Sequence, residues 1–142
     1  MLNRLISYAV AAALAVSAGY ASQSNTNVTI PVKKTAATSG EQMYTNYCAP
    51  CHGVDGRGSG PVSSSLKAAP IDLTLLSKNN GGKFPTEHIV SVLESGSTIP
   101  SHGSSQMPVW GPVFGKMGMQ NTQERSLRIK NLRLYLESIQ VK

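Results

Sequence analysis

The chain has 142 residues, which corresponds to one domain with short extensions. Only 14% of the residues are charged and 40% are hydrophobic, a composition that excludes an intrinsically disordered chain and a coiled coil. The net charge of +6 is basic, but scattered charge of this size does not by itself indicate nucleic acid binding, and two cysteines cannot build a disulfide scaffold.

The first 21 residues have the pattern of a secretory signal peptide. Arg4 is the only charged residue among them, a short apolar stretch runs from Leu5 to Ala18, and small residues follow. A positive start, a short apolar core and small residues at a cleavage site predict export, with the cut after Ala21. An uncleaved membrane anchor is the alternative. Export would place the mature protein in the periplasm or another extracytoplasmic compartment, where free thiols tend to oxidise.

Polar residues without periodicity fill residues 22–38, which we expect to be a flexible leader ahead of one folded domain, residues 39–142. Ser39 and Gln42 fit a capping box, in which the two side chains satisfy free backbone donors at the start of a helix. The first helix is therefore predicted to begin here and to continue to about residues 47–50.

Glycine-rich and proline-rich loops separate the next predicted helices. Residues 53–61 contain four glycines in nine positions and are expected to form a loop. Asp72 can cap a short helix that continues through Lys78. Pro85 suits the first position of a further helix, which Gly96 is expected to end.

The last third of the chain is predicted to contain one long helix. Residues 97–119 are rich in proline and glycine and are expected to be irregular. Asn121 and Glu124 open the last helix, whose apolar face is formed by Ile129, Leu132, Leu136 and Ile139. No segment shows a strand pattern. The sequence thus predicts an all-α fold of about four short helices, with a thin core that a bound cofactor would complete.

Cys48, Cys51 and His52 form the most informative motif of the chain. C-x-x-C-H is the attachment signal for c-type haem. Two thiols three positions apart project from one helical turn, so each can form a thioether with a haem vinyl group, and the adjacent imidazole can bind iron. A thioredoxin-like thiol pair, which needs a preceding strand, a zinc site, which needs four ligands, and a strained disulfide remain alternatives on the motif alone.

Four elements of the chain extend the pattern beyond this motif. They are Gly40-x-x-x-Tyr44-x-x-x-Cys48-x-x-Cys51-His52, Gly60-Pro61, Met107-Pro108-Val109-Trp110-Gly111 and Leu132-x-x-Tyr135-Leu136-x-x-Ile139. In this order they resemble the N-terminal helix, the Gly-Pro that follows the haem motif, the methionine ligand segment and the C-terminal helix of bacterial monohaem class I cytochromes c. The resemblance covers about residues 39–140 and implies a small cytochrome c-like fold around one covalently bound haem c, with its iron.

The resemblance implies the ligands of that haem. Cys48 and Cys51 would hold it covalently, His52 would be the proximal iron ligand and Met107 the distal ligand. The second ring nitrogen of His52 would donate to the backbone carbonyl of Pro61, which would fix the tautomer of the imidazole.

Other methionines and histidines could compete for the iron. Met117 and Met119 lie before the last helix and are the nearest rivals of the expected methionine, whereas Met43 is expected to pack in the core. His102 could form a bis-histidine site but is interpreted as a surface loop residue. No functional role is indicated for His88.

The resemblance also implies packing roles. Gly40 and Tyr135 would lie where the first and last helices cross. Trp110 is interpreted either as an ordinary buried aromatic residue or as a donor to a haem propionate. The basic residues of the last helix are expected to form a solvated face that could steer an acidic partner; they are Arg125, Arg128, Lys130 and Arg133.

A histidine and a methionine in the two axial positions would leave no open site for a substrate. The expected function is therefore periplasmic electron transfer rather than catalysis, as a soluble shuttle or as a small haem subunit of a respiratory or dehydrogenase complex. The expected partners are redox proteins and not nucleic acid, the membrane is a partner only if the N-terminal segment is retained, and the chain would be a monomer or a subunit of a larger complex. The alternative is a haem enzyme or ligand sensor with an open or labile distal site.

Overall fold

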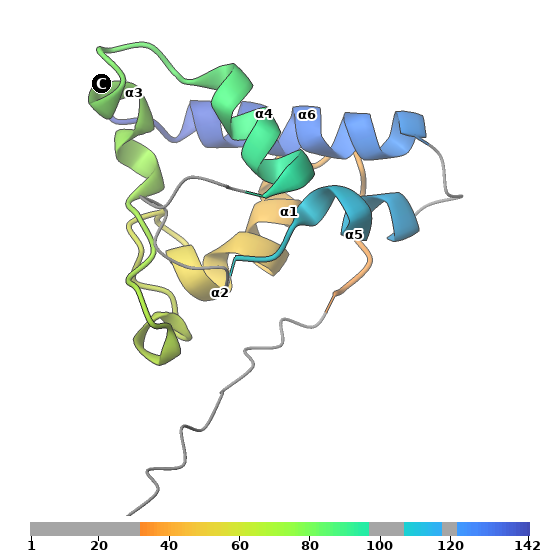
Figure 1. Ribbon diagram of the computed structural model, residues 1–142, viewed down its shortest axis with the longest axis horizontal. Helices are drawn as coiled ribbons and strands as arrows, with labels where there is room; N and C mark the ends of the chain where they lie inside the picture. Colours follow the sequence, from red (N-terminus) through yellow and green to blue (C-terminus); the bar gives the residue numbers. More distant parts are fainter. Residues whose placement is uncertain (1–31, 97–106, 118–121) are drawn as a thin grey trace, which may run out of the picture.

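A computed structural model describes residues 32–96, 107–117 and 122–142 (Figure 1). Every regular element in these residues is helical and none is a strand, so the predicted all-α fold is confirmed. The elements are α1 (Gly40–Met43), η1 (Tyr44–Cys48), α2 (Ala49–His52), η2 (Ser63–Ser65), η3 (Leu73–Leu75), α3 (Leu76–Asn79), α4 (Thr86–Ser95), α5 (Trp110–Met117) and α6 (Thr122–Ser138).

The predicted signal peptide lies outside the described residues, as does the leader up to residue 31. Within the described part of the chain, none of the helices has the length and apolar character that crossing a lipid bilayer requires.

Helix α6 packs against three other helices, α1, α4 and α5 (Figure 1). Its apolar face is buried as its periodicity predicts, with Ile129, Leu132 and Leu136 among the least exposed side chains. Gly40 of α1 and Tyr135 of α6 meet where the two helices cross, as expected. Contacts with α6 therefore fix the positions of both α1 and α5 in the fold.

The start of α1 follows the predicted cap only in part. The Ser39 hydroxyl accepts a hydrogen bond from the Gln42 backbone N–H at 3.1 Å. The Gln42 side chain does not return to Ser39; its Oε1 accepts from the backbone N–H of Ala36 at 2.8 Å. Gln42 thus ties the preceding segment to the helix in place of closing a capping box.

The segment that carries the cysteine motif changes its helical geometry along its length. The α-helical turn α1 continues into the π-helical turn η1, and α2 follows with α-helical geometry. Single π-turns of this kind occur often at functional sites. Tyr44, Tyr47 and Cys48 of η1 are all buried. The first helix therefore reaches His52, two residues beyond the predicted range.

The middle of the chain follows its predicted helix starts and ends to within one residue, since Pro85, expected at the first helical position, is the residue before it. The Asp72 carboxylate accepts from the Thr74 backbone N–H at 2.8 Å and begins η3, which leads into α3. Pro85 precedes the first residue of α4, and Gly96 ends this helix with a φ of +79°. A positive φ is a conformation that glycine adopts without steric cost.

The expectation of an irregular chain over residues 97–119 was wrong for residues 110–117, which form the helix α5. Pro112 lies in the first turn of α5, where a missing backbone N–H removes no helical hydrogen bond. Gly111 packs on α4, where a Cβ atom would lie 2.3 Å from the carbonyl oxygen of Glu94. In this segment Pro112 is compatible with the first turn of α5, and Gly111 allows α5 to approach α4 closely.

The expectation of a solvated basic face on α6 was wrong for Arg128. Its side chain is only 2% exposed, and its guanidinium forms an ion pair with Glu124 at 2.8 Å. It also donates to the hydroxyl and the carbonyl oxygen of Thr35. The cluster of basic residues on the last helix predicted a solvent-exposed Arg128, whereas the segment before α1, which contains Thr35, covers it.

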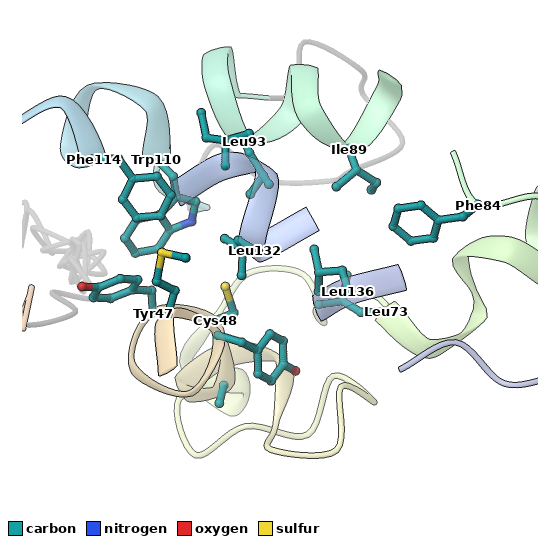
Figure 2. Packing of buried hydrophobic residues seen from close by; sticks show 14 residues of the cluster. Tyr47, Cys48, Leu73, Phe84, Ile89, Leu93, Trp110, Phe114, Leu132 and Leu136 are labelled. Atoms are coloured by element: carbon teal, nitrogen blue, oxygen red, sulfur yellow. The ribbon is translucent and has the colours of Figure 1, made fainter. Parts of the chain in front are cut away.

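The core contains a cluster of aromatic and aliphatic side chains from most of the elements (Figure 2). Met43 is fully buried, as predicted. Trp110 and Phe114 of α5 stack with ring centroids 5.7 Å apart, and Tyr47 lies beside them. Figure 2 also shows Cys48 directed toward the middle of the cluster, where Leu132 lies.

Candidate functional site

The four residues predicted to hold a cofactor line one cavity. Cys48, Cys51 and His52 come from the first helical segment, and Met107 comes from the chain just before α5. The cavity has a volume of about 290 Å³. Its remaining lining is mainly apolar and includes Leu66, Ala68, Ala69, Pro70, Ile71, Leu73, Ile89, Val92, Leu93, Val109, Trp110 and Leu136. The fold thus brings together residues that are far apart in the sequence.

The two cysteines are free thiols at this cavity. Cys48 ends η1 and is buried, whereas Cys51 lies in α2 and is half-buried. Burial, with a smaller contribution from the neighbouring Cys51, raises the pKa of the Cys48 thiol to about 12. Burial also raises the pKa of Cys51. Both thiols are therefore protonated at physiological pH, and both border the cavity that His52 also lines.

The orientation of His52 is set by a hydrogen bond from its ring to the backbone. The Nδ1 atom lies 3.1 Å from the carbonyl oxygen of Ile71. Burial lowers the pKa of His52, and the bond to Ile71 opposes this shift. The imidazole is therefore neutral, with its proton on Nδ1 and the lone pair of Nε2 free to bind a metal ion.

The expectation that Pro61 accepts this hydrogen bond was wrong. Residues 60–62 run along the backbone of the cysteine motif, where the N–H of Gly60 donates to Cys51 and that of Val62 donates to Pro50, each at 3.0 Å. A Cβ atom at Gly60 would lie 2.3 Å from the carbonyl oxygen of Pro50. The Gly60-Pro61 segment therefore packs against α2. The following loop, which contains Ile71, supplies the carbonyl that binds His52.

Ile71, whose backbone carbonyl binds the ring of His52, is a residue of the candidate site that the sequence did not indicate. The Leu73 N–H donates to the carbonyl of Gly56 at 2.7 Å, which ties the loop of Ile71 to the loop after the motif. Asp72 caps η3 directly after it. Every residue has a backbone carbonyl, so the residue types cannot show which carbonyl accepts the hydrogen bond from His52. The predicted cap at Asp72 was the one sequence signal for an ordered turn next to Ile71.

The Tyr44 hydroxyl donates to the carbonyl oxygen of Gly53 at 2.6 Å, next to His52 in the chain. Burial raises the pKa of Tyr44, so the phenol is protonated and acts as a donor. The end of α2 is therefore fixed from the first turn of η1.

Of the methionines that the structure describes, Met107 lines the cavity and Met43 and Met117 do not. Met107 is 41% exposed. The sulfur of Met117 lies 3.5 Å from the hydroxyl of Tyr47. The other rivals, Met119 and His102, lie outside the described residues, and His88 is not part of the cavity wall.

The donor set fits a covalently held haem. Two thiols, one imidazole nitrogen and one thioether border an apolar cavity, so attachment sites, iron ligands and a wall for the ring occur together. Across residues 32–96, 107–117 and 122–142, there is no cluster of three or more His, Cys, Asp or Glu side chains arranged to bind a metal ion.

Comparison with known proteins yields one family. The family model described as cytochrome c oxidase, cbb3-type, subunit III matches residues 35–123. This range contains the cysteine motif, Ile71 and Met107. No curated protein and no solved structure matches the chain.

Proposed function

The chain belongs to the family of cytochrome c oxidase, cbb3-type, subunit III, and from this premise we propose that it transfers electrons through a haem c whose iron is bound by His52 and Met107. The membership confirms the predicted class I monohaem c-type cytochrome and its covalent haem c. It also supports haem-based electron transfer as the general function.

One observation carries the proposed ligation. Both predicted ligands border the same cavity as the two cysteines, and the remaining nitrogen of His52 is already bound to the carbonyl of Ile71. Met107 is favoured over Met117 because only Met107 borders this cavity among the described methionines.

The residues of the chain perform distinct tasks in this proposal. When bound, haem c supplies a one-electron iron couple. Ile71 orients His52, and Met107 supplies a soft donor that favours the ferrous state and raises the potential. Leu93 and Trp110 belong to the apolar wall of the cavity, which would limit the access of water to a bound haem. With both axial positions filled by protein, the site would exchange electrons and would not bind a substrate.

The cellular setting belongs to the same proposal. The N-terminal sequence favours export, so the protein would act in the periplasm, free or attached to the membrane by an uncleaved segment. Its partners would be redox proteins, which it meets as a soluble shuttle or as a small haem subunit of a respiratory or dehydrogenase complex.

Visible spectroscopy of the exported haem-bound protein tests the ligation. We expect the oxidised protein to show a weak long-wavelength sulfur-to-iron band, and the reduced protein not to bind carbon monoxide. Met107→Ala should abolish the band and open the iron to carbon monoxide, whereas Met117→Ala should retain the wild-type spectrum. Carbon monoxide binding by the wild type would instead support the enzyme or sensor with an open distal site. Loss of the band in Met117→Ala alone would assign the ligand to Met117.

A further inference from the structure

Residues 33–38, here called the strap, run along the domain without regular secondary structure (orange in Figure 1). Side chains of α1 and α6 bind its backbone. Arg128 donates to the carbonyl of Thr35 at 2.9 Å and Asn131 donates to that of Ala37 at 3.0 Å. The N–H of Ala36 donates to Gln42. This part of the expected leader is therefore docked on the folded domain.

A chain of hydrogen bonds connects Arg128 through the strap to Tyr47. The guanidinium of Arg128 lies 3.1 Å from the Thr35 hydroxyl, which lies 2.8 Å from the Tyr47 hydroxyl, and that hydroxyl bonds to the carbonyl of Lys33. A guanidinium only donates and a carbonyl only accepts. The direction is thus fixed: Arg128 donates to Thr35, Thr35 donates to Tyr47, and Tyr47 donates to Lys33.

Tyr47 connects this chain to the cavity. Tyr47 is one of the residues that line the cavity, and it directly precedes Cys48. The ring centroid lies 5.2 Å from that of Trp110 and 5.8 Å from that of Phe114 (Figure 2). Trp110 begins α5, and Met107 lies three residues before it. The Tyr47 ring therefore lies between the strap and the segment that carries the proposed distal ligand.

We propose that Tyr47 is a positioning residue for Met107, and that the strap holds it in place through the hydrogen bonds from Arg128 and Thr35. This inference rests on the proposed ligation by Met107. The hydroxyl bonds fix the ring, the ring fixes Trp110 from one side, and Trp110 fixes the short segment that leads back to Met107. The sulfur of Met107 is thereby kept within reach of the iron.

Loss of the Tyr47 hydroxyl would release this arrangement without removing the ring. Thr35 would lose its acceptor, the strap would lose its bond at Lys33, and the ring would be held by stacking alone. The thioether would then dissociate from the iron more often. Because a bound thioether favours the ferrous state, the reduction potential should fall, and the reduced iron should become open to carbon monoxide.

The test compares the haem-bound wild type with Tyr47→Phe and Thr35→Val, which cut the hydrogen-bond chain at two places. Tyr135→Phe and Thr38→Val are matched controls that remove the same hydroxyl groups. Neither residue belongs to the hydrogen-bond chain from Arg128 to Lys33 or lines the cavity, and Thr38 is an exposed residue of the strap itself. Three quantities are measured: the reduction potential, the fraction of reduced protein that binds carbon monoxide, and the amide exchange rate of residues 33–38.

We expect both cutting variants to lower the potential, to bind carbon monoxide and to exchange the strap amides at least tenfold faster, while both controls behave like the wild type. Faster exchange or a lower melting temperature with an unchanged potential and no carbon monoxide binding would overturn the positioning role and leave the strap a structural element. Carbon monoxide binding by the reduced wild type would show that the proposed ligation by Met107 is wrong. In that case, an unchanged reduction potential in both Tyr47→Phe and Thr35→Val would also overturn the link between the strap and the iron.

Discussion

Gly40 and Asn131 lie so close together that a Cβ atom at Gly40 would be 2.2 Å from the carbonyl oxygen of Asn131. The contact is between backbones, which cannot move aside as a flexible side chain can. Because Gly40 begins α1 and Asn131 lies in the middle of α6, this contact sets the distance between the cysteine motif and the main helix of the fold.

Substitution Gly40→Ala should push α1 away from α6. Overpacking of this kind costs about 1–3 kcal/mol of the free energy of unfolding. Chemical denaturation of the haem-bound protein measures it. Gly115→Ala in α5 is the matched control, because the added Cβ atom meets only the Arg125 side chain at 3.9 Å. The control should be neutral or slightly stabilising, since alanine favours a helix over glycine by up to about 1 kcal/mol. Equal effects of the two substitutions would contradict the role of Gly40.

The two ion pairs between arginine and glutamate on α6 should differ in their contribution to stability. Arg128 is 2% exposed and its partner Glu124 is 29% exposed, whereas Arg133 and Glu137 are 17% and 45% exposed. Arg128→Met leaves buried groups on Thr35 without a donor and should cost about 2–3 kcal/mol in thermal or chemical unfolding. Arg133→Met should cost less than about 1 kcal/mol, because solvent screens the outer pair.

The carbonyl of Ile71 depends on the turn that Asp72 caps. The Asp72 carboxylate accepts from both the N–H and the hydroxyl of Thr74. Asp72→Ala should therefore destabilise the protein by about 0.5–2 kcal/mol and disturb the bond from His52 to Ile71. The measurements are denaturation and the NMR shifts of the proximal imidazole. Asp72→Asn keeps an acceptor oxygen and should restore both; a shift of the imidazole signals in Asp72→Asn equal to that in Asp72→Ala would refute this dependence.

Without covalent haem the domain should not keep its packed core. Haem would fill the apolar cavity of about 290 Å³, so without it the side chains that line the cavity lose those contacts and face solvent. Cys48→Ser combined with Cys51→Ser, purified free of haem, should show weak near-ultraviolet dichroism and no cooperative unfolding. A sharp unfolding transition in this variant would show that the helices fold without the cofactor.

The sequence by itself determined the local chemistry of this protein. The spacing of Cys48, Cys51 and His52, the caps at Ser39 and Asp72, and the apolar face of α6 all depend on residues close together in the chain. Such features follow from helix geometry and backbone hydrogen bonding, which act over a few residues. For the same reason the sequence predicted the all-α fold, whereas the haem family followed from the resemblance of four separate elements of the chain to class I cytochromes c.

Only the tertiary structure decided which distant groups meet. It placed the carbonyl of Ile71 against His52 where Pro61 was expected, buried Arg128 under the strap, and formed α5 in a stretch that its prolines and glycines marked as irregular. Each of these outcomes depends on a contact between segments far apart in the chain. A residue pattern records which side chains can bond, but packing determines which partner lies within bonding distance.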